Sequence, residues 1–356
     1  MTVHIEKLSP ETEGGYEKLL MEVPTSLLYH SLQYRRFLKQ ILADAKDHYL
    51  VAIEGDQVIA AIPAFIKTGS FGAVVNSLPF YGSNGSIVAK KDCLSSVNHA
   101  LLQAFDQMCK EVNAVTSTIV ANPLELAGEL PADYKPDLLD ERIGQITPLP
   151  SDIAMEELGA HLIRSFHVKT RNLVRKGERS GFDIGHDGSD DTMHQLHALH
   201  ESNMAAIGGL AKPWAVFQAI QQNFAYDRDY RIYTAKKNGR LAASLLVFFS
   251  NKTAEYFIPV IQQEYRSDQP LSYLIFVAMQ DAVIKGCRWW NWGGTWLSQD
   301  GVYHFKSRWG TKDYKYKYFI KAHSDLSEIK NKNVDEILAQ YPYFYVLPFS
   351  EIVCNE

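Results

Sequence analysis

Two stretches of the chain share one pattern of apolar and polar positions. Residues 48–66 (HYLVAIEGDQVIAAIPAFI) and 230–249 (YRIYTAKKNGRLAASLLVFF) each contain a β-rich run, a turn signal and a second β-rich run. The turn signals are Gly55-Asp56 and Asn238-Gly239, and such pairs favour tight turns between strands. Both stretches therefore predict a β-hairpin.

The elements after each hairpin also come in the same order. Residues 98–112 and 271–286 favour a helix, and a β-rich run follows each of them, at 114–121 and at 287–294. Equivalent elements lie about 180 residues apart, which indicates an internal duplication. We therefore expect an α/β fold with mixed sheets (α+β), built from two units of one kind.

A Pro-containing seam separates the two predicted units. The segment IGQITPLPSD carries Pro148 and Pro150, as a linker does. We place the N-terminal unit at residues 1–147, the C-terminal unit at 148–323 and a tail at 324–356. The tail predicts one helix, followed by the apolar and aromatic segment YPYFYVLPF.

The composition narrows the class of protein. With 46% hydrophobic and 22% charged residues, the 356-residue chain is typical of folded globular proteins, and its net charge of −5 confines any basic function to a local patch. Four cysteines without a CxxC pair argue against a disulfide framework and against a thiolate zinc site. The sequence predicts no signal peptide and no transmembrane segment, so we expect a cytoplasmic protein, with the inner membrane surface as an alternative location.

Residues 164–179 form a dense run of positive charge, with six cations and one acid. Arg171, Arg175 and Arg179 recur every four residues and would share one face of a helix. Neighbouring cations on a helix repel each other, whereas arginine suits bidentate contacts with phosphate. The run predicts a phosphate-binding face, and the alternative is a solvated face that binds nothing.

Tryptophan is concentrated late in the chain. Within the predicted strand at 287–294, Trp290 and Trp292 would share one face. We expect two or three of the clustered tryptophans to pack in the core and the others to form a platform for sugar rings or an alkyl chain. The cluster holds five of the six tryptophans: Trp289, Trp290, Trp292, Trp296 and Trp309.

Four segments of the second half resemble the Fem family of peptidoglycan-bridge aminoacyltransferases and its FemAB-like relatives. They are residues 168–184, 240–260, 273–295 and 302–310 (VYHFKSRWG), with further likeness at 27–41 and 77–88. The resemblance implies two tandem GNAT-like acyltransferase units, with two central strands that splay apart to admit the donor. It also implies transfer of an activated aminoacyl or acyl group onto an amine of a cell-envelope or polysaccharide precursor.

The same resemblance suggests catalytic residues, because it places Phe305 and Lys306 beside the reacting acyl group. A fixed ammonium among aromatic side chains would stabilise the oxyanion that forms when an amine attacks an ester or thioester. The alternative is a lysine whose stem merely covers apolar surface. Predicted substrate-binding residues are Arg171, Asn172, Arg175, Tyr256, Trp292 and Arg308, and the candidates for a general base are Asp268, Glu255 and His304.

The sequence leaves the donor open between aminoacyl-tRNA and acyl-CoA. GNAT enzymes that use acetyl-CoA carry a glycine-containing turn where the pyrophosphate meets a helix N-terminus. The corresponding segment here, QQEYRSDQPLS (262–272), has no glycine, and Asp268 is a predicted N-cap before Pro270. A carboxylate there would compete with the pyrophosphate, which favours aminoacyl-tRNA. Fem enzymes, however, contact tRNA through an inserted helical hairpin, and the sequence offers no candidate for one.

Expected partners follow from this hypothesis. They are a phosphorylated cell-envelope or nucleotide-sugar-type acceptor, tRNA, and a membrane contacted peripherally. We expect no permanently bound cofactor and no metal, because His194, His197 and His200 lack the carboxylates of an HExxH site. Two other functions fit the same sequence: an acyl-CoA-dependent N-acyltransferase on an amino sugar or related metabolite, and a non-catalytic glycan- or nucleic-acid-binding protein on the same fold.

Overall fold

The computed structural model describes residues 3–81, 83–125, 130–131 and 134–352. Its contacts divide the chain into a first unit, residues 1–143 with 315–356, and a second unit, residues 144–314. Residues 315–323 thus group with the first unit, whereas the sequence-based division joined them to the second. The physical reason is strand pairing, because β15 (Lys312–Ala322) runs antiparallel to β8 (Ala114–Val120).

The first unit contains two runs of paired strands. One has the order β1-β3-β4-β7, and the other has the order β15-β8-β6-β5-β2. Its strands are β1 (Val3–Lys7), β2 (Lys46–Asp47), β3 (Leu50–Glu54), β4 (Gln57–Ile62), β5 (Phe65–Gly69), β6 (Gly72–Asn76), β7 (Val88–Ala89), β8 and β15, with the beginning of β9 (Leu138–Pro148). Its helices are α1 (Pro10–Glu22), η1 (Leu28–His30), α2 (Leu32–Ile41), α3 (Ser95–Glu111), α10 (Ser327–Lys330), α11 (Val334–Gln340) and η3 (Phe349–Glu351).

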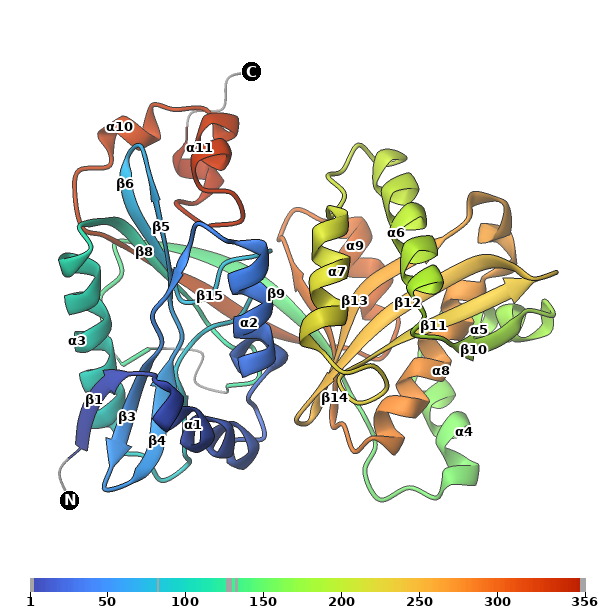
Figure 1. Ribbon diagram of the computed structural model, residues 1–356. Coiled ribbons are helices and arrows are strands. Elements are labelled where there is room, and N and C mark those ends of the chain that lie inside the picture. The colour runs from blue at the N-terminus through green and yellow to red at the C-terminus, as the bar shows by residue number, and fades with distance from the viewer. Residues whose placement is uncertain (1–2, 82, 126–129, 132–133, 353–356) are drawn as a thin grey trace. The chain divides into compact units, whose positions relative to one another are not determined.

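The second unit contains one run of strands in the order β10-β11-β12-β13-β14. These strands are β10 (Asp183–His186), β11 (Tyr230–Lys237), β12 (Arg240–Ser250), β13 (Thr253–Ile261) and β14 (Trp289–Thr295). The helices are α4 (Met155–Ser165), α5 (Val168–Arg179), α6 (Asp190–Ala205), α7 (Trp214–Asn223), η2 (Gln263–Asp268), α8 (Pro270–Ile284) and α9 (Asp300–Ser307). Figure 1 labels most of these elements.

Both predicted hairpins are confirmed. Strands β3 and β4 pair antiparallel up to Glu54 and Gln57, and β11 and β12 pair up to Lys237 and Arg240. Asn238 and Gly239 both have positive φ, as a two-residue hairpin turn of this hand requires. The helix and strand predicted after each hairpin are present as α3 and β8 in the first unit and as α8 and β14 in the second.

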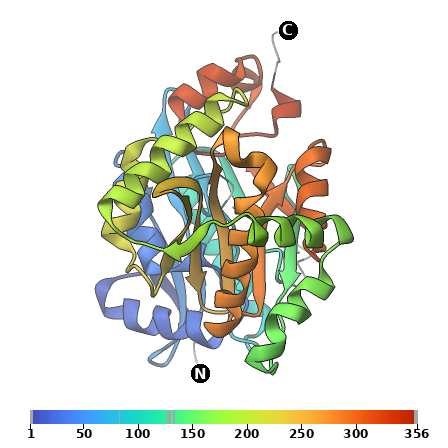
Figure 2. The ribbon, with the colours of Figure 1, turned by 90° about the vertical axis from the view of Figure 1, so that its right-hand side faces the viewer.

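The sheet of the second unit is covered on both faces (Figure 2). Helices α6 and α7 lie on one face, and α4, α5 and α8 lie on the other. The core beneath α4, α5 and α8 combines aliphatic side chains of β11 and β12 with three buried tryptophans, Trp290, Trp292 and Trp309. This core supports the strands that carry the candidate site.

The tail packs on the first unit. Its two short helices, α10 and α11, lie by the hairpin of β5 and β6 (Figure 1). The hydroxyl of buried Tyr341 donates to Gly72 O at 3.0 Å and accepts from Phe71 N at 3.2 Å. The apolar-aromatic segment is therefore held by burial and by specific hydrogen bonds to this hairpin.

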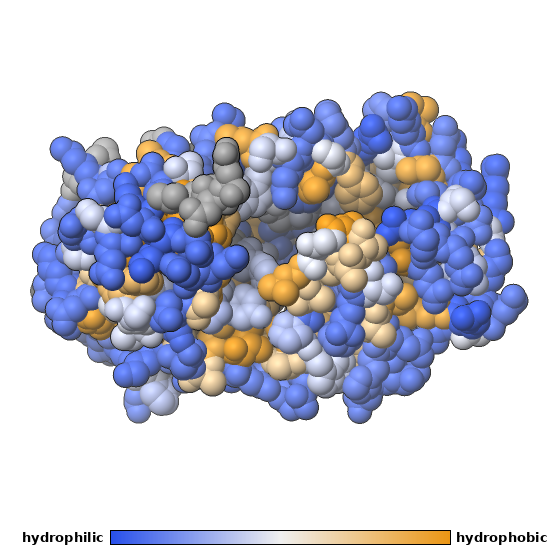
Figure 3. Space-filling view, turned by 90° about the horizontal axis from the view of Figure 1, so that it is seen from above, coloured by the Kyte–Doolittle hydropathy of each residue, from blue (hydrophilic) through white to orange (hydrophobic). Residues whose placement is uncertain are grey.

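On the face shown in Figure 3, hydrophilic residues dominate the surface of both units, and hydrophobic residues gather in small patches. Among the described residues, none of the helices combines the length and the apolar character that a bilayer span requires.

Candidate active site

Two central strands of the second unit separate after a short paired stretch. Strands β13 and β14 run parallel and pair at three positions, from Thr253 with Trp289 to Glu255 with Asn291. Beyond these pairs β13 continues for six residues and β14 for four without pairing to each other. A register shift opposite Val247 bends β13 at this point, and Gly293 takes a φ of 75° in β14. The result is an opening with a β13 arm and a β14 arm.

Aromatic side chains gather where the opening begins. The rings of Tyr256 and Trp292 lie 4.8 Å apart, and Trp292 also contacts the rings of Phe305 at 6.0 Å and Trp309 at 5.5 Å. The indole Nε1 of Trp292 donates to Thr147 Oγ1 at 2.9 Å, which fixes the ring. Burial raises the pKa of Tyr256, so its phenol stays protonated at neutral pH. The structure thus brings three predicted site residues together.

Lys306 belongs to α9 and is buried against the β14 arm, with 7% of its surface exposed. Its Nζ donates to Thr295 Oγ1 at 2.9 Å, Gly294 O at 3.1 Å and Gly293 O at 3.3 Å. The hydroxyl of Thr295 in turn donates to Gln145 Oε1 at 3.1 Å. Burial lowers the pKa of Lys306 to about 8. The ammonium therefore braces the divergent end of β14, and its role in catalysis stays a prediction.

Helix α5 begins beside the end of α9. The amide of His167 donates to Arg308 O at 2.9 Å, and the rings of Phe166 and Trp309 lie 5.1 Å apart. Arg171 donates to Phe166 O at 2.8 Å and to Arg164 O at 3.1 Å. Two donor groups of Arg171 thus bind carbonyls at the end of α4. The sequence predicted a phosphate contact for this side chain and not these bonds.

The rest of the basic face of α5 is exposed. Arg175, Lys176 and Arg179 are solvent-exposed, and none of them makes an ion pair within the described part of the chain. Together with Asn172 and Ser180 they line a shallow hollow of about 450 Å³. Ser180 Oγ also donates to Asp268 O at 3.1 Å, so this end of the face lies by the start of α8. The hollow provides three cations for an anionic group.

Close packing of α5 on α8 depends on a glycine. A Cβ at Gly177 would lie 2.5 Å from Gln269 O and 2.8 Å from Tyr273 Cβ. Both are closer than carbon atoms approach in proteins, and one of them belongs to backbone. Gly177 therefore lets the basic helix lie directly against the helix that follows β13.

The three candidates for a general base occupy different places. Glu255 is buried at the last paired position of β13, and His304 is exposed on α9. Asp268 lies past the far end of the β13 arm, where its carboxylate is 3.8 Å from Lys237 Nζ. The structure does not gather them at one point, and the choice of base stays a prediction.

The predicted N-cap of α8 is wrong. Asp268 ends the short helix η2, and the N-cap position belongs to Gln269, which has a left-handed φ of 61°. Pro270 is the first helical residue, as predicted. The left-handed Gln269 separates Asp268 from the first residue of α8, so the Asp268 carboxylate does not cap this helix.

The open edge of β13 is partly occupied by a side chain from α6. Asn203 Nδ2 donates to Ile261 O at 2.9 Å, and Ile261 N donates to Asn203 Oδ1 at 3.0 Å. Gln262 N donates to Ala242 O in β12. In an antiparallel pair, residues whose backbone groups bond to the partner strand alternate with residues whose backbone groups point away from it. The backbone groups of Ile261 and Pro259 therefore point away from β12. Pro259 has no N–H to offer at that edge.

The three histidines of α6 contact a neighbouring loop and helix. His200 Nε2 accepts from Lys212 N at 3.0 Å, and His194 stacks on Trp214 at 3.9 Å between ring centroids. Within the described residues no group of three or more ligand-type side chains is placed to hold a metal ion.

Comparison with known proteins agrees with this geometry. Residues 164–316 match the family model described as an acetyltransferase (GNAT) domain. Among solved structures, FemX aligns with a TM-score of 0.69 at 14% identity, over 88% of this chain and 96% of that chain. The chain has a FemAB-like tandem GNAT acyltransferase fold. The fold expected from the sequence is confirmed.

Two further structures share this tandem GNAT fold. A tandem GNAT protein from the clavulanic acid biosynthesis pathway has a TM-score of 0.50 at 11% identity, over 91% of this chain and 99% of its own. The C-terminal domain of a putative lysylphosphatidylglycerol synthetase from Agrobacterium fabrum has a TM-score of 0.53 at 10% identity, over 95% and 98%. Among curated proteins, no sequence matches this chain significantly.

Several residues that shape the site carry no sequence signal. Asn203 meets its partner 58 positions away, and Thr147 meets Trp292 across 145 positions. Each is an ordinary polar residue within its own segment, so only the folded arrangement of the GNAT unit identifies its role.

Proposed function

We propose that the protein is a Fem-like acyltransferase, which moves an activated aminoacyl or acyl group onto an amine of a phosphorylated cell-envelope or polysaccharide precursor. One observation carries the proposal: β13 and β14 part after Glu255 and Asn291, and a buried ammonium, that of Lys306, is fixed on the β14 arm. The GNAT fold places acyl transfer at such an opening.

The proposed chemistry is attack of an amine on the carbonyl of an activated ester. A C–N bond forms, the C–O bond of the ester breaks, and the proton lost by the amine goes to the departing alkoxide oxygen, which leaves as a hydroxyl group. The oxyanion formed between these events would replace Gly293 O, the most distant of the three acceptors around Lys306 Nζ. A preorganised donor of this kind accelerates acyl transfer by about 10²–10³-fold.

Aminoacyl-tRNA is the donor that the β13 edge favours. The pantetheine arm of CoA carries amide groups that suit main-chain hydrogen bonding along a free strand edge. At this edge Pro259 lacks an N–H, and both polar groups of Ile261 are bonded to Asn203. A CoA thioester would therefore find few hydrogen-bonding partners, whereas an aminoacyl ester makes no such demand on the edge.

The basic face of α5 is proposed as the acceptor phosphate site. Arg175, Lys176 and Arg179 are free of acidic partners among the described residues, and they line the hollow of about 450 Å³. Arginine pairs with phosphate oxygens through parallel hydrogen bonds. We therefore assign the phosphorylated portion of the acceptor to this face, with Asn172 as a neutral contact.

The decisive experiment is single-turnover transfer from a mixture of radiolabelled aminoacyl-tRNAs to UDP-linked amino-sugar peptides. Transfer by the wild type, a loss of about 10²–10³-fold in Lys306→Met and partial recovery in Lys306→Arg are expected. Unfolding of each variant by urea is measured in parallel, because Lys306 also braces β14. Full activity in a folded Lys306→Met variant would remove the proposed mechanism.

A second candidate is an acyl-CoA-dependent N-acyltransferase acting on an amino sugar or related metabolite. One comparison favours it: residues 164–316 match the model described as an acetyltransferase (GNAT) domain. Saturable stabilisation of the wild type by CoA or acetyl-CoA in a thermal unfolding assay would support this candidate over the tRNA-dependent one. No stabilisation at millimolar CoA would exclude it.

A further inference from the structure

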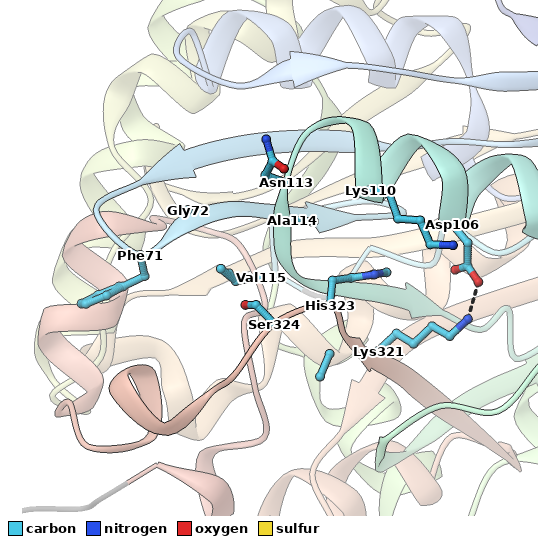
Figure 4. A pocket seen from close by; sticks show the side chains of 11 residues that line it. Phe71, Gly72, Asp106, Lys110, Asn113, Ala114, Val115, Lys321, His323 and Ser324 are labelled. Atoms are coloured by element: carbon cyan, nitrogen blue, oxygen red, sulfur yellow. Dashed lines mark hydrogen bonds and ion pairs between the residues drawn. The ribbon is translucent and has the colours of Figure 1, made fainter.

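The first unit contains a hollow of about 600 Å³ that takes no part in the proposed acyl transfer (Figure 4). Three segments border it: the turn between β5 and β6, the end of α3 with the start of β8, and the end of β15. All of its lining residues belong to the first unit. They are Phe71, Gly72, Asp106, Lys110, Asn113, Ala114, Val115, Lys321, Ala322, His323 and Ser324.

Charged and polar side chains converge at one end of this hollow. Figure 4 shows Lys110 and Asp106 of α3 facing Lys321 and His323 of β15 and the residue after it. Lys321 forms an ion pair with Asp106 and lies over the ring of Tyr134, 4.7 Å from its centroid. Lys110 is exposed and makes no ion pair with any described residue. One cation at this end therefore lacks a partner.

The imidazole of His323 is held in place by β8. Its Nε2 lies 2.9 Å from Oγ of Ser117, which is fully buried in β8, and its backbone N–H donates to Val115 O. When the ring is protonated, Nε2 donates to Ser117 Oγ and Nδ1 carries the second proton. The second ring nitrogen is then a donor, and its orientation is fixed before any ligand arrives.

Asp106 provides a further sign of a missing partner. Its Oδ1 is buried and receives no hydrogen bond from the described residues, while Oδ2 is taken by Lys321. A buried carboxylate oxygen without a donor destabilises the folded state. The ion pair made by Oδ2 keeps Lys321 at the edge of the hollow.

We propose that this hollow binds a compact oxyanion, the phosphate or carboxylate group of a small molecule, through Lys110, Lys321 and His323. The two ammonium groups provide the attraction, and the fixed imidazole provides direction. Asp106 holds Lys321 in place through their ion pair. The site is separate from the opening between β13 and β14, so its occupancy does not depend on the proposed acyl transfer.

Anion binding and protonation of His323 should be linked. The charged groups that face this imidazole are Asp106 and Lys110 of α3, Lys321 of β15, and Asp137 before β9. Burial and the two lysines lower the pKa of His323, and the two aspartates oppose them. A bound anion adds negative charge beside the ring and raises this pKa, so affinity for the anion falls as pH rises.

The test is NMR observation of the histidine ring signals of the full chain during titration with inorganic phosphate, methyl phosphate or acetate, at constant ionic strength set with chloride. One histidine signal is expected to shift saturably with anion concentration. The loss of this signal in His323→Gln assigns it to His323. Lys110→Met should weaken binding about tenfold, whereas Lys91→Met, at an exposed lysine of the same unit outside the hollow, should bind as the wild type does.

The relative affinity for the anions tells which class of small molecule the hollow binds. Tighter binding of methyl phosphate than of acetate indicates a phosphorylated molecule, and the reverse indicates a carboxylated one. Shifts that stay linear to high anion concentration, or an equal loss of affinity in Lys110→Met and Lys91→Met, would overturn the proposal. Thermal unfolding of each variant separates lost binding from lost folding.

Discussion

Both units contain a hairpin, then a helix and a strand in the same order, but they differ in how their central strands pair. In the second unit, β13 and β14 pair at three positions and then part. In the first unit, β6 and β8 pair in parallel from Ala73 to Asn76, almost the whole length of β6. The chain then continues the contact, since Ser77 N donates to Thr118 O and Gly85 N donates to Val120 O. The first unit is closed where the second is open.

The closure of the first unit comes from extra chain rather than from altered strands. The segment after β6 buries several polar side chains, and Asn84 Nδ2 donates to Ala121 O at the end of β8. The tail adds Tyr345, whose backbone N and O both bond to the side chain of Asn76. In the first unit, extra chain thus continues the contact beyond the paired strands, whereas β13 and β14 of the second unit separate after three pairs.

The largest expected effect compares two buried lysines, one in each unit. Lys306 is held by carbonyls beside the opening, whereas Lys67 is held by an ion pair with Asp44. Lys306→Met should lower kcat by about 10²–10³-fold, and Lys67→Met should leave kcat unchanged while lowering stability. Transfer kinetics with urea unfolding of both variants checks this, and a similar fall in kcat for both would end the functional distinction between the units.

A smaller effect is expected from filling the contact between α5 and α8. Gly177→Ala should destabilise the protein by about 1–3 kcal/mol, because the new Cβ meets the backbone at Gln269. Gly159→Ala is the matched control, since its Cβ would meet no backbone: its nearest neighbours are the end of the Gln280 side chain at 3.2 Å and Phe276 Cζ at 3.5 Å. Urea unfolding measures both, and equal stabilities would show that the helices can separate without cost.

The pH profile separates the charge of Lys306 from its packing. Burial lowers the pKa of Lys306 from its ordinary 10.5 to about 8, so the unfolded chain binds more protons between these values. Stability contributed by this group should therefore rise as pH increases from about 8 to 10.5. Activity that needs the ammonium should fall by about tenfold per pH unit above 8. Rates that stay level to pH 9.5 in stably folded protein would contradict an ammonium role.

The basic face of α5 should affect acceptor binding more than turnover. Substituting Arg175 and Arg179 together by Ala should raise KM for a phosphorylated acceptor by about tenfold and leave kcat within twofold. The difference from wild type should shrink at high salt because exposed charges are screened. An unphosphorylated acceptor is the control, and an equal rise of its KM would place the effect elsewhere.

An effect on stability of the same size as that of Gly177→Ala is expected in the support of Trp292. Thr147→Val removes the acceptor of its indole N–H, and this change should cost about 1–3 kcal/mol of stability. Urea unfolding of the variant measures this cost. An unchanged stability would show that the hydrogen bond from Trp292 does not contribute to folding. Thr311→Val, at a threonine whose buried hydroxyl has no partner among the described residues, is the control.

Local patterns in the sequence determined the elements and their order. Asn238-Gly239 fixes a two-residue turn, β-rich runs set the strands on either side, and Pro270 starts a helix, because each acts over a few neighbouring residues. The same range limits what such patterns reveal. Asp268 had the side chain of an N-cap, yet it ends η2, and a left-handed Gln269 takes the N-cap position of α8.

Only the tertiary structure decided how the polar groups are used. Arg171 bonds to carbonyls at the end of α4, Asn203 binds the edge of β13, and Lys306 braces β14. The sequence determined that cations and aromatic residues would be close along the chain, but not which carbonyls they would meet. Hydrogen-bond partners 12 to 58 residues away are set by the packing of helices on the sheet, because satisfying buried polar groups is a property of the whole unit.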